Sequence, residues 1–331
     1  MKWTEQGLFQ AVGRTPLVKL ARVLAPASFE LYGKLELLNP GGSSKDRPAL
    51  RMLRTAIESG RIHPDTVIVE SSSGNLAISL AQLCNVLDLT FICVVDPKTT
   101  AQNLRLLRLF GAQIDLVEVP DPETGEYLPA RLKRVKELLQ RNPDSFWPNQ
   151  YASPDNAGAH FHTTMEEILG ALPRMDYLFC GVSTCGTIRG CAELAKSRGA
   201  HVKIVAVDAM GSAIFGPSAG KRLLPGLGAA VRPPLCPDET GLIHDVVYVS
   251  DQDCIEGCRR LLKQESILAG GSSGGVLMAV EKYKPQLPEG AVCAAILPDR
   301  GDRYLDTVFS DEWVIGQFGE AGLRGHHLRE P

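Results

Sequence analysis

A glycine-rich run that ends in a single lysine can anchor a carbonyl compound through a Schiff base. Residues 39–48 read NPGGSSKDRP, with Lys45 after two glycines and two serines. The glycines allow a tight backbone turn, and three polar residues offer N-terminal caps for a helix that begins here, namely Ser43, Ser44 and Asp46. A lysine amine that forms an imine needs such a fixed mount and a partly dry pocket that lowers its pKa. The run predicts a covalent cofactor site, although a capped helix start whose lysine reaches solvent fits the same residues.

Three more glycine-containing segments could bind parts of a cofactor or substrate. They are residues 71–75 (SSSGN) and 182–187 (VSTCGT), each of which follows an apolar, strand-like run and precedes a helix-like one, and residues 269–275 (AGGSSGG). The first two bring hydroxyls and backbone amides to a helix N-terminus, which suits a carboxylate or a phosphate. The third has small residues that let a planar group approach the backbone, and its serine hydroxyl can meet a ring nitrogen. Ordinary serine-rich helix caps fit the first two segments as well.

Together these segments resemble one family, the pyridoxal-phosphate enzymes of the cysteine synthase and cystathionine β-synthase group. The likeness also takes in residues 12–17 (VGRTPL) and 296–305 (ILPDRGDRYL), and it spans nearly the whole chain in family order. The resemblance implies the α/β architecture of fold-type II enzymes, with two doubly wound domains similar to the tryptophan synthase β chain. It also implies pyridoxal 5'-phosphate as the cofactor and a β-replacement reaction on amino acids.

The resemblance further assigns roles to individual residues. Lys45 would hold the cofactor and act as general base, Asn75 would bond the ring hydroxyl, and Ser272 would face the ring nitrogen. The cofactor phosphate would be held by the loop residues Ser183, Thr184, Cys185, Gly186 and Thr187. Substrate would be bound by Ser72, Ser73, Asn75, Gln150, Tyr151 and Arg131, the last through a guanidinium fork that suits a carboxylate.

One branch of the family is closer still. Residues 147–151 (WPNQY), 205–209 (VAVDA) and 224–228 (LPGLG) resemble the synthases that build the 2,3-diaminopropionate unit of siderophores and related natural products. Those enzymes join O-phospho-L-serine to L-glutamate and give N-(2-amino-2-carboxyethyl)-L-glutamate and phosphate. Departures from cysteine synthases support this branch, because two glycines of the phosphate loop and a threonine after the asparagine are replaced here by Ser183, Cys185 and Leu76. We expect these changes to alter the pocket beside the reacting carbon.

Two other functions fit the same motifs. A cysteine synthase would take sulfide with O-acetylserine or O-phosphoserine. A non-catalytic relative would bind the cofactor and act as a regulatory protein, but the intact Lys45, Asn75 and Ser272 argue against this reading. In every case we expect a homodimer, since two-fold dimers are the habit of the family and the commonest symmetry.

The composition indicates a globular protein and excludes some partners. The chain has 331 residues, of which 44% are hydrophobic, enough for two domains that each have a core. With 35 basic against 38 acidic residues, it lacks the electrostatic footprint of a protein that binds nucleic acid or anionic membrane. Apolar stretches are shorter than a membrane span and no signal-type run follows Met1, so we expect a cytoplasmic protein.

The nine cysteines are an odd number and mostly fall in apolar patterns, which fits reduced, buried thiols. Cys254 and Cys258 are one helical turn apart, but no second pair or histidine cluster accompanies them, so we expect no metal site. Cys185 differs from the other cysteines because it lies in the expected phosphate loop.

Strand-like and helix-like segments alternate, which predicts parallel sheets with helices on both faces. Strands are expected at residues 31–35, 66–70, 89–95, 113–118, 177–181, 202–208 and 291–297. Helices are expected at residues 47–59, 76–86, 100–110 and 130–140. By resemblance, residues 41–150 would form a small mobile domain, and residues 1–40 with 151–316 a larger one. Residues 317–331 lack periodicity and are expected to form a flexible tail.

Overall fold

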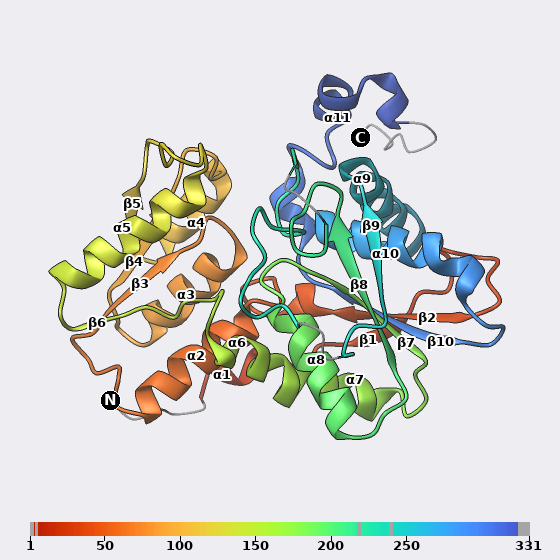
Figure 1. Ribbon diagram of the computed structural model, residues 1–331, viewed down its shortest axis with the longest axis horizontal. Coiled ribbons are helices and arrows are strands. Elements are labelled where there is room, and N and C mark those ends of the chain that lie inside the picture. Colours follow the sequence, from red (N-terminus) through yellow and green to blue (C-terminus); the bar gives the residue numbers. More distant parts are fainter. Residues whose placement is uncertain (1–2, 4–5, 217–219, 238–240, 324–331) are drawn as a thin grey trace. The chain divides into compact units, whose positions relative to one another are not determined.

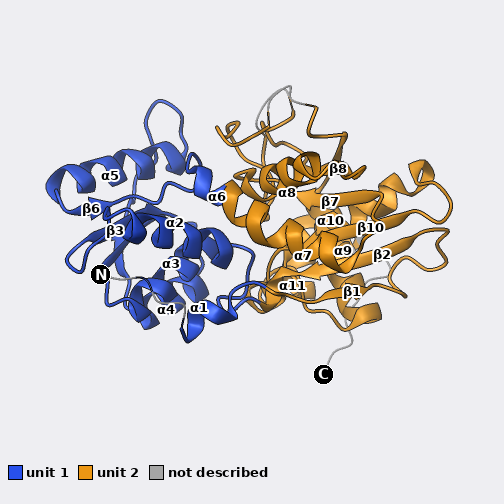
Figure 2. Ribbon diagram, turned by 90° about the horizontal axis from the view of Figure 1, so that it is seen from below, with its two compact units in different colours: residues 1–13, 39–156 blue, residues 14–38, 157–331 orange. Residues whose placement is uncertain are grey.

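The computed structural model describes residues 3, 6–216, 220–237 and 241–323. The chain divides into two compact units, of which unit 1 comprises residues 1–13 and 39–156 and unit 2 comprises residues 14–38 and 157–331 (Figure 2). Residues 1–13 therefore group with unit 1, whereas the sequence suggested the larger domain. The reason is local packing, because Phe9 is buried in the core of unit 1.

Unit 1 is built around a four-stranded sheet in the order β5-β4-β3-β6, and every neighbouring pair is parallel. The strands are β3 (Val67–Ser71), β4 (Phe91–Val95), β5 (Gln113–Leu116) and β6 (Ser145–Phe146). The helices are α1 (Leu8–Ala11), α2 (Asp46–Glu58), α3 (Asn75–Val86), α4 (Ala101–Leu109) and α5 (Tyr127–Arg141), and α6 (Pro154–Ala159) crosses to unit 2 along the chain.

Alternating side chains along the strands of unit 1 pack into two hydrophobic cores, one on each face of the sheet. Ile68 of β3 packs in the cluster formed with α2 and α3, while its neighbour Val69 packs with Val135 of α5 on the other face. Successive side chains of a strand point to opposite faces, so a sheet that is apolar on both sides needs helices on both. Figure 1 shows these helices around the sheet of unit 1.

Unit 2 contains a six-stranded sheet in the order β1-β2-β10-β7-β8-β9. Its strands are β1 (Leu17–Lys19), β2 (Glu30–Leu35), β7 (Tyr177–Gly181), β8 (Lys203–Ala209), β9 (Asp245–Val249) and β10 (Val292–Leu297). The edge strand β1 is antiparallel to β2, and the other pairs are parallel. The helices are α7 (Met165–Ala171), α8 (Gly186–Ser197), α9 (Asp251–Arg260), α10 (Gly271–Tyr283) and α11 (Asp311–Phe318).

Short helical segments complete the fold. The 3₁₀ segments are η1 (Glu36–Leu38), η4 (Lys284–Gln286), η5 (Gly301–Tyr304) and η6 (Glu320–Leu323), and the π segments are η2 (His160–Thr164) and η3 (Leu261–Glu265). Of the tail expected at residues 317–331, the part up to Leu323 belongs to α11 and η6, and residues 324–331 lie outside the described chain. Among the described residues, no helix combines the length and apolar character needed to cross a membrane.

The sheet of unit 2 also divides its side chains between two cores. On β7, Phe179 packs with α10 on one face, while Leu178 packs with Ile188 of α8 on the other. The α/β class expected from the sequence is therefore confirmed. In each parallel sheet the carboxyl ends of the strands meet at one edge, which is where such sheets bind ligands.

Candidate active site

Lys45 is the residue that immediately precedes α2 in unit 1. It occupies the N-cap position, is half-buried, and donates its backbone N–H to Ser43 Oγ over 3.3 Å. Asp46 does not serve as the expected cap, because its buried carboxylate accepts hydrogen bonds from the Gly41 N–H and from Ser79 Oγ of α3. The lysine therefore has a rigid mount, although Asp46 fixes it by a route other than capping.

The serine-rich loop after β3 is held in place by several bonds. Ser72 Oγ accepts the Ala77 N–H over 3.3 Å, and the Ser73 carbonyl accepts from Asn103 Nδ2 over 2.9 Å. Asn75 is the first residue of α3. Leu76 was expected to alter the pocket beside the reacting carbon, but its side chain is 2% exposed and packs in the core of unit 1.

Arg131 lies on α5 and reaches the residue that follows β4. Its Nε is 3.3 Å from Asp96 Oδ2, and both side chains are buried. Neither Nε nor Nη1 of Arg131 makes a hydrogen bond within unit 1 or elsewhere in the described chain. A buried guanidinium with unused donors is well suited to an anionic ligand group, because such groups accept in a fork geometry.

The segment after β6 carries the other two expected substrate residues. Gln150 is buried and donates from Nε2 to the Ser71 carbonyl over 3.4 Å. Tyr151 is half-buried, and burial raises the pKa of its hydroxyl. The carboxyl edge of the unit 1 sheet thus brings together Ser72, Arg131, Gln150 and Tyr151, although their roles remain predictions.

In unit 2 the expected phosphate loop joins β7 to α8. Cys185 is the N-cap of α8 and has a left-handed backbone conformation with φ 64°. This turn directs the first amide groups of a twelve-residue helix outward, and free amides at a helix start attract anions. Thr187 Oγ1 lies 3.2 Å from His160 Nε2, and His160 Nδ1 lies 2.8 Å from Thr164 Oγ1, so the half-buried Thr187 is connected to the buried pair His160 and Thr164.

The thiol of Cys185 points into the apolar core of unit 2. Its hydrogen bond with Cys236 and its burial raise the pKa of Cys185 well above the ordinary value. A thiol that stays protonated and buried packs as a small apolar group and is chemically inert.

Ser272 lies in the first turn of α10 and is buried. Its Oγ is 3.4 Å from Asp299 Oδ1, and the other carboxylate oxygen of Asp299 accepts from Tyr304 Oη over 2.7 Å. Gly270 makes this arrangement possible, because a Cβ at that position would lie 2.1 Å from Asp299 Oδ1. Asp299 and Tyr304 therefore fix the hydroxyl that the sequence assigned to the ring nitrogen.

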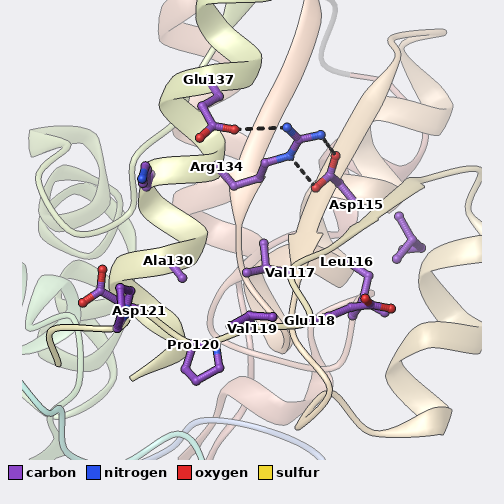
Figure 3. A pocket seen from close by; sticks show the side chains of 13 residues that line it. Asp115, Leu116, Val117, Glu118, Val119, Pro120, Asp121, Ala130, Arg134 and Glu137 are labelled. Carbon is purple, nitrogen blue, oxygen red and sulfur yellow. Dashed lines mark hydrogen bonds and ion pairs between the residues drawn. The ribbon is translucent and has the colours of Figure 1, made fainter. Parts of the chain in front are cut away.

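A surface cleft of about 630 Å³ lies elsewhere on unit 1, between α5 and the segment from β5 to Pro122 (Figure 3). Arg134 dominates it and is held by Asp115 and Glu137, at 2.8 Å and 3.2 Å. None of the expected site residues lines this cleft. The three charged groups at its centre, Arg134, Asp115 and Glu137, are paired with one another.

The residues present suit pyridoxal phosphate. Unit 1 offers an amine on a rigid mount and a hydroxyl-rich loop, and unit 2 offers a helix N-terminus for a phosphate and a fixed serine hydroxyl. No group of three or more histidine, cysteine or acidic side chains among the described residues could hold a metal ion. Each unit by itself therefore offers groups that suit an organic phosphate cofactor.

Comparison with known proteins identifies the class. The family described as pyridoxal-phosphate dependent enzymes matches residues 8–299, and the chain belongs to this family. The expected cofactor and the expected enzyme class are thereby confirmed.

Two relatives bear the name N-(2-amino-2-carboxyethyl)-L-glutamate synthase. The protein from Ralstonia nicotianae is 46% identical over 311 residues, which cover 93% of this chain and 91% of the relative. The protein from Cupriavidus metallidurans is 44% identical over 312 residues, with coverage of 93% and 90%.

Two solved structures have the same fold. A hydrogen sulfide-producing enzyme from Fusobacterium nucleatum has a TM-score of 0.85 at 31% identity, over 92% of this chain and 99% of that one. An O-acetylserine dependent cystathionine β-synthase from Helicobacter pylori has a TM-score of 0.83 at 32% identity, over 93% and 99%. The fold-type II architecture expected from the sequence is thereby confirmed.

Sequence reasoning missed two acidic residues at the carboxyl edge of unit 1, Glu70 and Asp96. Both are buried, and each ends an apolar strand-like run. A single acid at the end of such a run is the signal that could have found them, since an isolated buried carboxyl needs partners.

Proposed function

We propose that this enzyme joins O-phospho-L-serine and L-glutamate to give N-(2-amino-2-carboxyethyl)-L-glutamate and phosphate. The product contains the 2,3-diaminopropionate unit, so the reaction would serve the synthesis of a siderophore or related natural product. The names of the two relatives at 46% and 44% identity support this proposal, and their coverage of nearly the whole chain extends the support to both units.

The observation that carries the proposal is the buried guanidinium of Arg131. A reaction that uses phosphoserine and glutamate brings three anionic groups besides the α-carboxylate of the first substrate, namely the phosphate and the two carboxylates of glutamate. Arg131 has donors without hydrogen-bond partners at the ligand-binding edge of the unit 1 sheet. Sulfide, the nucleophile of a cysteine synthase, has no carboxylate for a guanidinium fork to bind.

We assign the remaining residues by the groups they offer. Lys45 would hold the cofactor through its side-chain amine and would move the α-proton of the substrate, and Asn75 would bond the ring hydroxyl. Ser72, Ser73, Asn75 and Gln150 bind the α-carboxylate of the substrate, and Tyr151 and Arg131 face the second substrate. Ser183, Thr184, Cys185, Gly186 and Thr187 hold the cofactor phosphate, with Cys185 contributing backbone because its thiol is buried.

The cofactor supplies an electron sink for the carbanion that forms when the α-proton leaves. Ser272 sets how strong this sink is. Its neutral hydroxyl, held by Asp299, stabilises a positive ring nitrogen less than a carboxylate would. This favours elimination and replacement at the β-carbon over transamination.

A cysteine synthase is the second candidate, because both solved structures with the same fold have names that refer to sulfide or to O-acetylserine. The two functions differ in donor and acceptor. The purified enzyme is therefore incubated with phosphoserine or O-acetylserine and with glutamate or sulfide, and the products are identified by mass. We expect the glutamate adduct from phosphoserine. Rapid cysteine formation without any glutamate adduct would reject the proposal in favour of the second candidate.

We also propose a cellular compartment and an oligomeric state for the enzyme. All nine cysteines are free and buried, which suits a reducing compartment such as the cytoplasm. We propose a homodimer in solution, which sedimentation of the purified protein tests directly.

A further inference from the structure

Glu70 is a buried carboxyl group for which the reaction described above has no use. It is the penultimate residue of β3 and is fully buried. Its Oε1 accepts from Trp147 Nε1 over 3.0 Å and from the Ser71 N–H over 2.9 Å, and its Oε2 accepts from the Gln150 N–H over 3.3 Å. All three partners are N–H donors, so they match the ionised form of the carboxyl group.

These bonds join the two segments that carry the substrate residues of unit 1. Ser71 leads into the serine-rich loop, and Trp147 and Gln150 belong to the segment that ends in Tyr151. The sheet itself holds this segment weakly, because β6 has two residues and pairs with β3 only at Ser145 and Phe146. Glu70 continues the connection beyond the last paired residues.

A second set of contacts depends on the same arrangement. Gln150 Nε2 donates to the Ser71 carbonyl over 3.4 Å, and Asn156 Nδ2 donates to the Gln150 carbonyl over 2.7 Å. Asn149, between Trp147 and Gln150, has a left-handed backbone with φ 50°. Surrounding bonds stabilise a turn of this kind. Glu70 accepts one bond on each side of it, from Trp147 and from Gln150.

We propose that ionised Glu70 is a positioning residue that fixes the Ser72–Ser73 loop and the Gln150–Tyr151 segment in the arrangement that binds the α-carboxylate of the substrate. The inference rests on the proposed function, which assigns both segments to the substrate. A protonated Glu70 would direct an O–H toward N–H donors and lose at least one of the bonds. The substrate site would then loosen without loss of the cofactor.

The surroundings make Glu70 the group that changes charge near neutral pH. Burial raises the pKa of Glu70 to about 7, although its N–H partners act in the opposite direction. Cys93 of β4 and Tyr151 face it, and burial raises the pKa of both, so they stay neutral. Arg131 of α5 lies in the same region and is paired with Asp96.

The test measures the binding of L-alanine to the holoenzyme, because this amino acid offers an α-carboxylate but no leaving group. The change in visible absorbance of the cofactor reports binding between pH 6 and pH 8. For the unchanged protein we expect affinity to fall as the pH drops below about 7. For Trp147→Phe we expect this fall at higher pH, because the variant lacks a donor that stabilises the ionised form. For Glu70→Gln we expect affinity about tenfold weaker at pH 8, with no step near pH 7.

Glu118→Gln is the matched control, since Glu118 is an exposed glutamate of the same unit. It should bind L-alanine as the unchanged protein does. Ionisation of the amine of L-alanine is common to all four proteins and cancels in the comparison. If Glu70→Gln does not fold, the shift in Trp147→Phe decides the question alone.

The inference is overturned if Glu70→Gln keeps the affinity and pH dependence of the unchanged protein, or if Trp147→Phe shows no shift. These outcomes leave the proposed function intact as long as the glutamate adduct is formed. Failure of the proposed function would instead appear as a missing adduct in the unchanged protein at pH 8, where Glu70 is ionised.

Discussion

Asp46 accepts a hydrogen bond from Ser79, and this bond joins the start of α2 to α3, one turn after its first residue, Asn75. Ser79 Oγ also lies 3.0 Å from the carbonyl of Asn75. Lys45 directly precedes Asp46 in the chain, so one buried contact fixes the backbones of two residues assigned to the cofactor. The same carboxylate accepts the Gly41 N–H, which ties the glycine turn to the helix it leads into.

Replacement of Asp46 by alanine should therefore loosen Lys45 as well as the fold. It removes the buried Asp46 acceptor of the Gly41 N–H and one of the two acceptors of the Ser79 hydroxyl, so we expect the free energy of unfolding to fall by about 2 to 4 kcal/mol. Ser79→Ala keeps the bond between Gly41 and Asp46 and should lose about 1 kcal/mol. Denaturant unfolding gives these values, and borohydride trapping of the cofactor reports the state of Lys45.

The control is Glu58→Ala at the exposed end of α2, where only a surface pair with Arg54 is lost. It should change stability by less than about 0.5 kcal/mol. If Asp46→Ala traps as much cofactor as the control, the carboxylate does not orient Lys45.

Gly41→Ala tests the same turn from the other side. A Cβ at position 41 would lie 2.4 Å from Asp46 Oδ1, so the carboxylate must move. We expect a loss of about 1 to 3 kcal/mol, typical of overpacking. Gly170→Ala in α7 meets no atom within 4 Å and should instead add about 0.5 to 1 kcal/mol. Equal thermal midpoints for the two variants would contradict this.

The sequence predicted long elements better than short ones, for a physical reason. The predicted strand at 177–181 matches β7, and the predicted helix at 47–59 is one residue from α2. The two-residue strand β6 is absent from the strands expected from the sequence, because it lies between Pro143 and Pro148 and carries no periodic pattern. It exists because Ser145 and Phe146 pair with β3, a contact that no local signal contains.

The residues of the candidate site also divide into those with a local sequence signal and those without one. Lys45 and Asn75 were predicted from segments whose glycines and hydroxyls have a local meaning. Glu70 was not, because the run Val67-Ile68-Val69-Glu70 reads as a strand, and two of its three partners, Trp147 and Gln150, are more than seventy residues away in the chain. Leu76 was misjudged because sequence alone does not say which face of α3 is buried.

Ionisation of Glu70 should destabilise the protein as the pH rises. The pKa of Glu70 is about 7 in the folded protein against 4.5 without burial, so the folded state holds a proton that the unfolded chain releases. The extra stability is fully present below pH 4.5 and is lost as the pH rises through 7. It amounts to about 3 kcal/mol at 1.36 kcal/mol per pKa unit.

Denaturant unfolding between pH 5 and pH 8 measures this effect as the difference between the unchanged protein and Glu70→Gln. The difference should shift by about 2 to 3 kcal/mol in favour of the variant as the pH increases. Parallel stability curves for the two proteins would mean that Glu70 is ionised throughout. In that case binding would also lack a step near pH 7.

The nine buried thiols should be unreactive in the folded protein. Burial raises the pKa of Cys84, Cys93, Cys254 and Cys293, and Cys185 is further held by its contact with Cys236. Because the thiolate is the nucleophile, a disulfide reagent should label none of them rapidly at pH 8 and all nine after unfolding. One fast-reacting thiol, located by mass analysis, would show that its segment opens to solvent.

Arg131→Met should weaken the binding of one anionic substrate and leave the cofactor in place. The variant removes the buried guanidinium whose Nε and Nη1 lack hydrogen-bond partners, so we expect KM for glutamate, the second substrate, to rise about tenfold or more while kcat changes less. Steady-state kinetics with each substrate varied in turn tests whether the effect is confined to glutamate. Arg131→Lys keeps the charge but loses the fork, and it should recover only part of the affinity.

Removal of Arg131 also leaves Asp96 buried without its cation, which lowers stability by about 3 kcal/mol or more, so each variant is assayed well below its unfolding temperature. Arg134→Met is the matched control, because Arg134 lies on the same helix but pairs with Asp115 and Glu137 at the surface cleft (Figure 3). It should leave both KM values unchanged. If both variants raise KM equally, the effect comes from α5 as a whole, and Arg131 is then a structural residue that touches neither substrate.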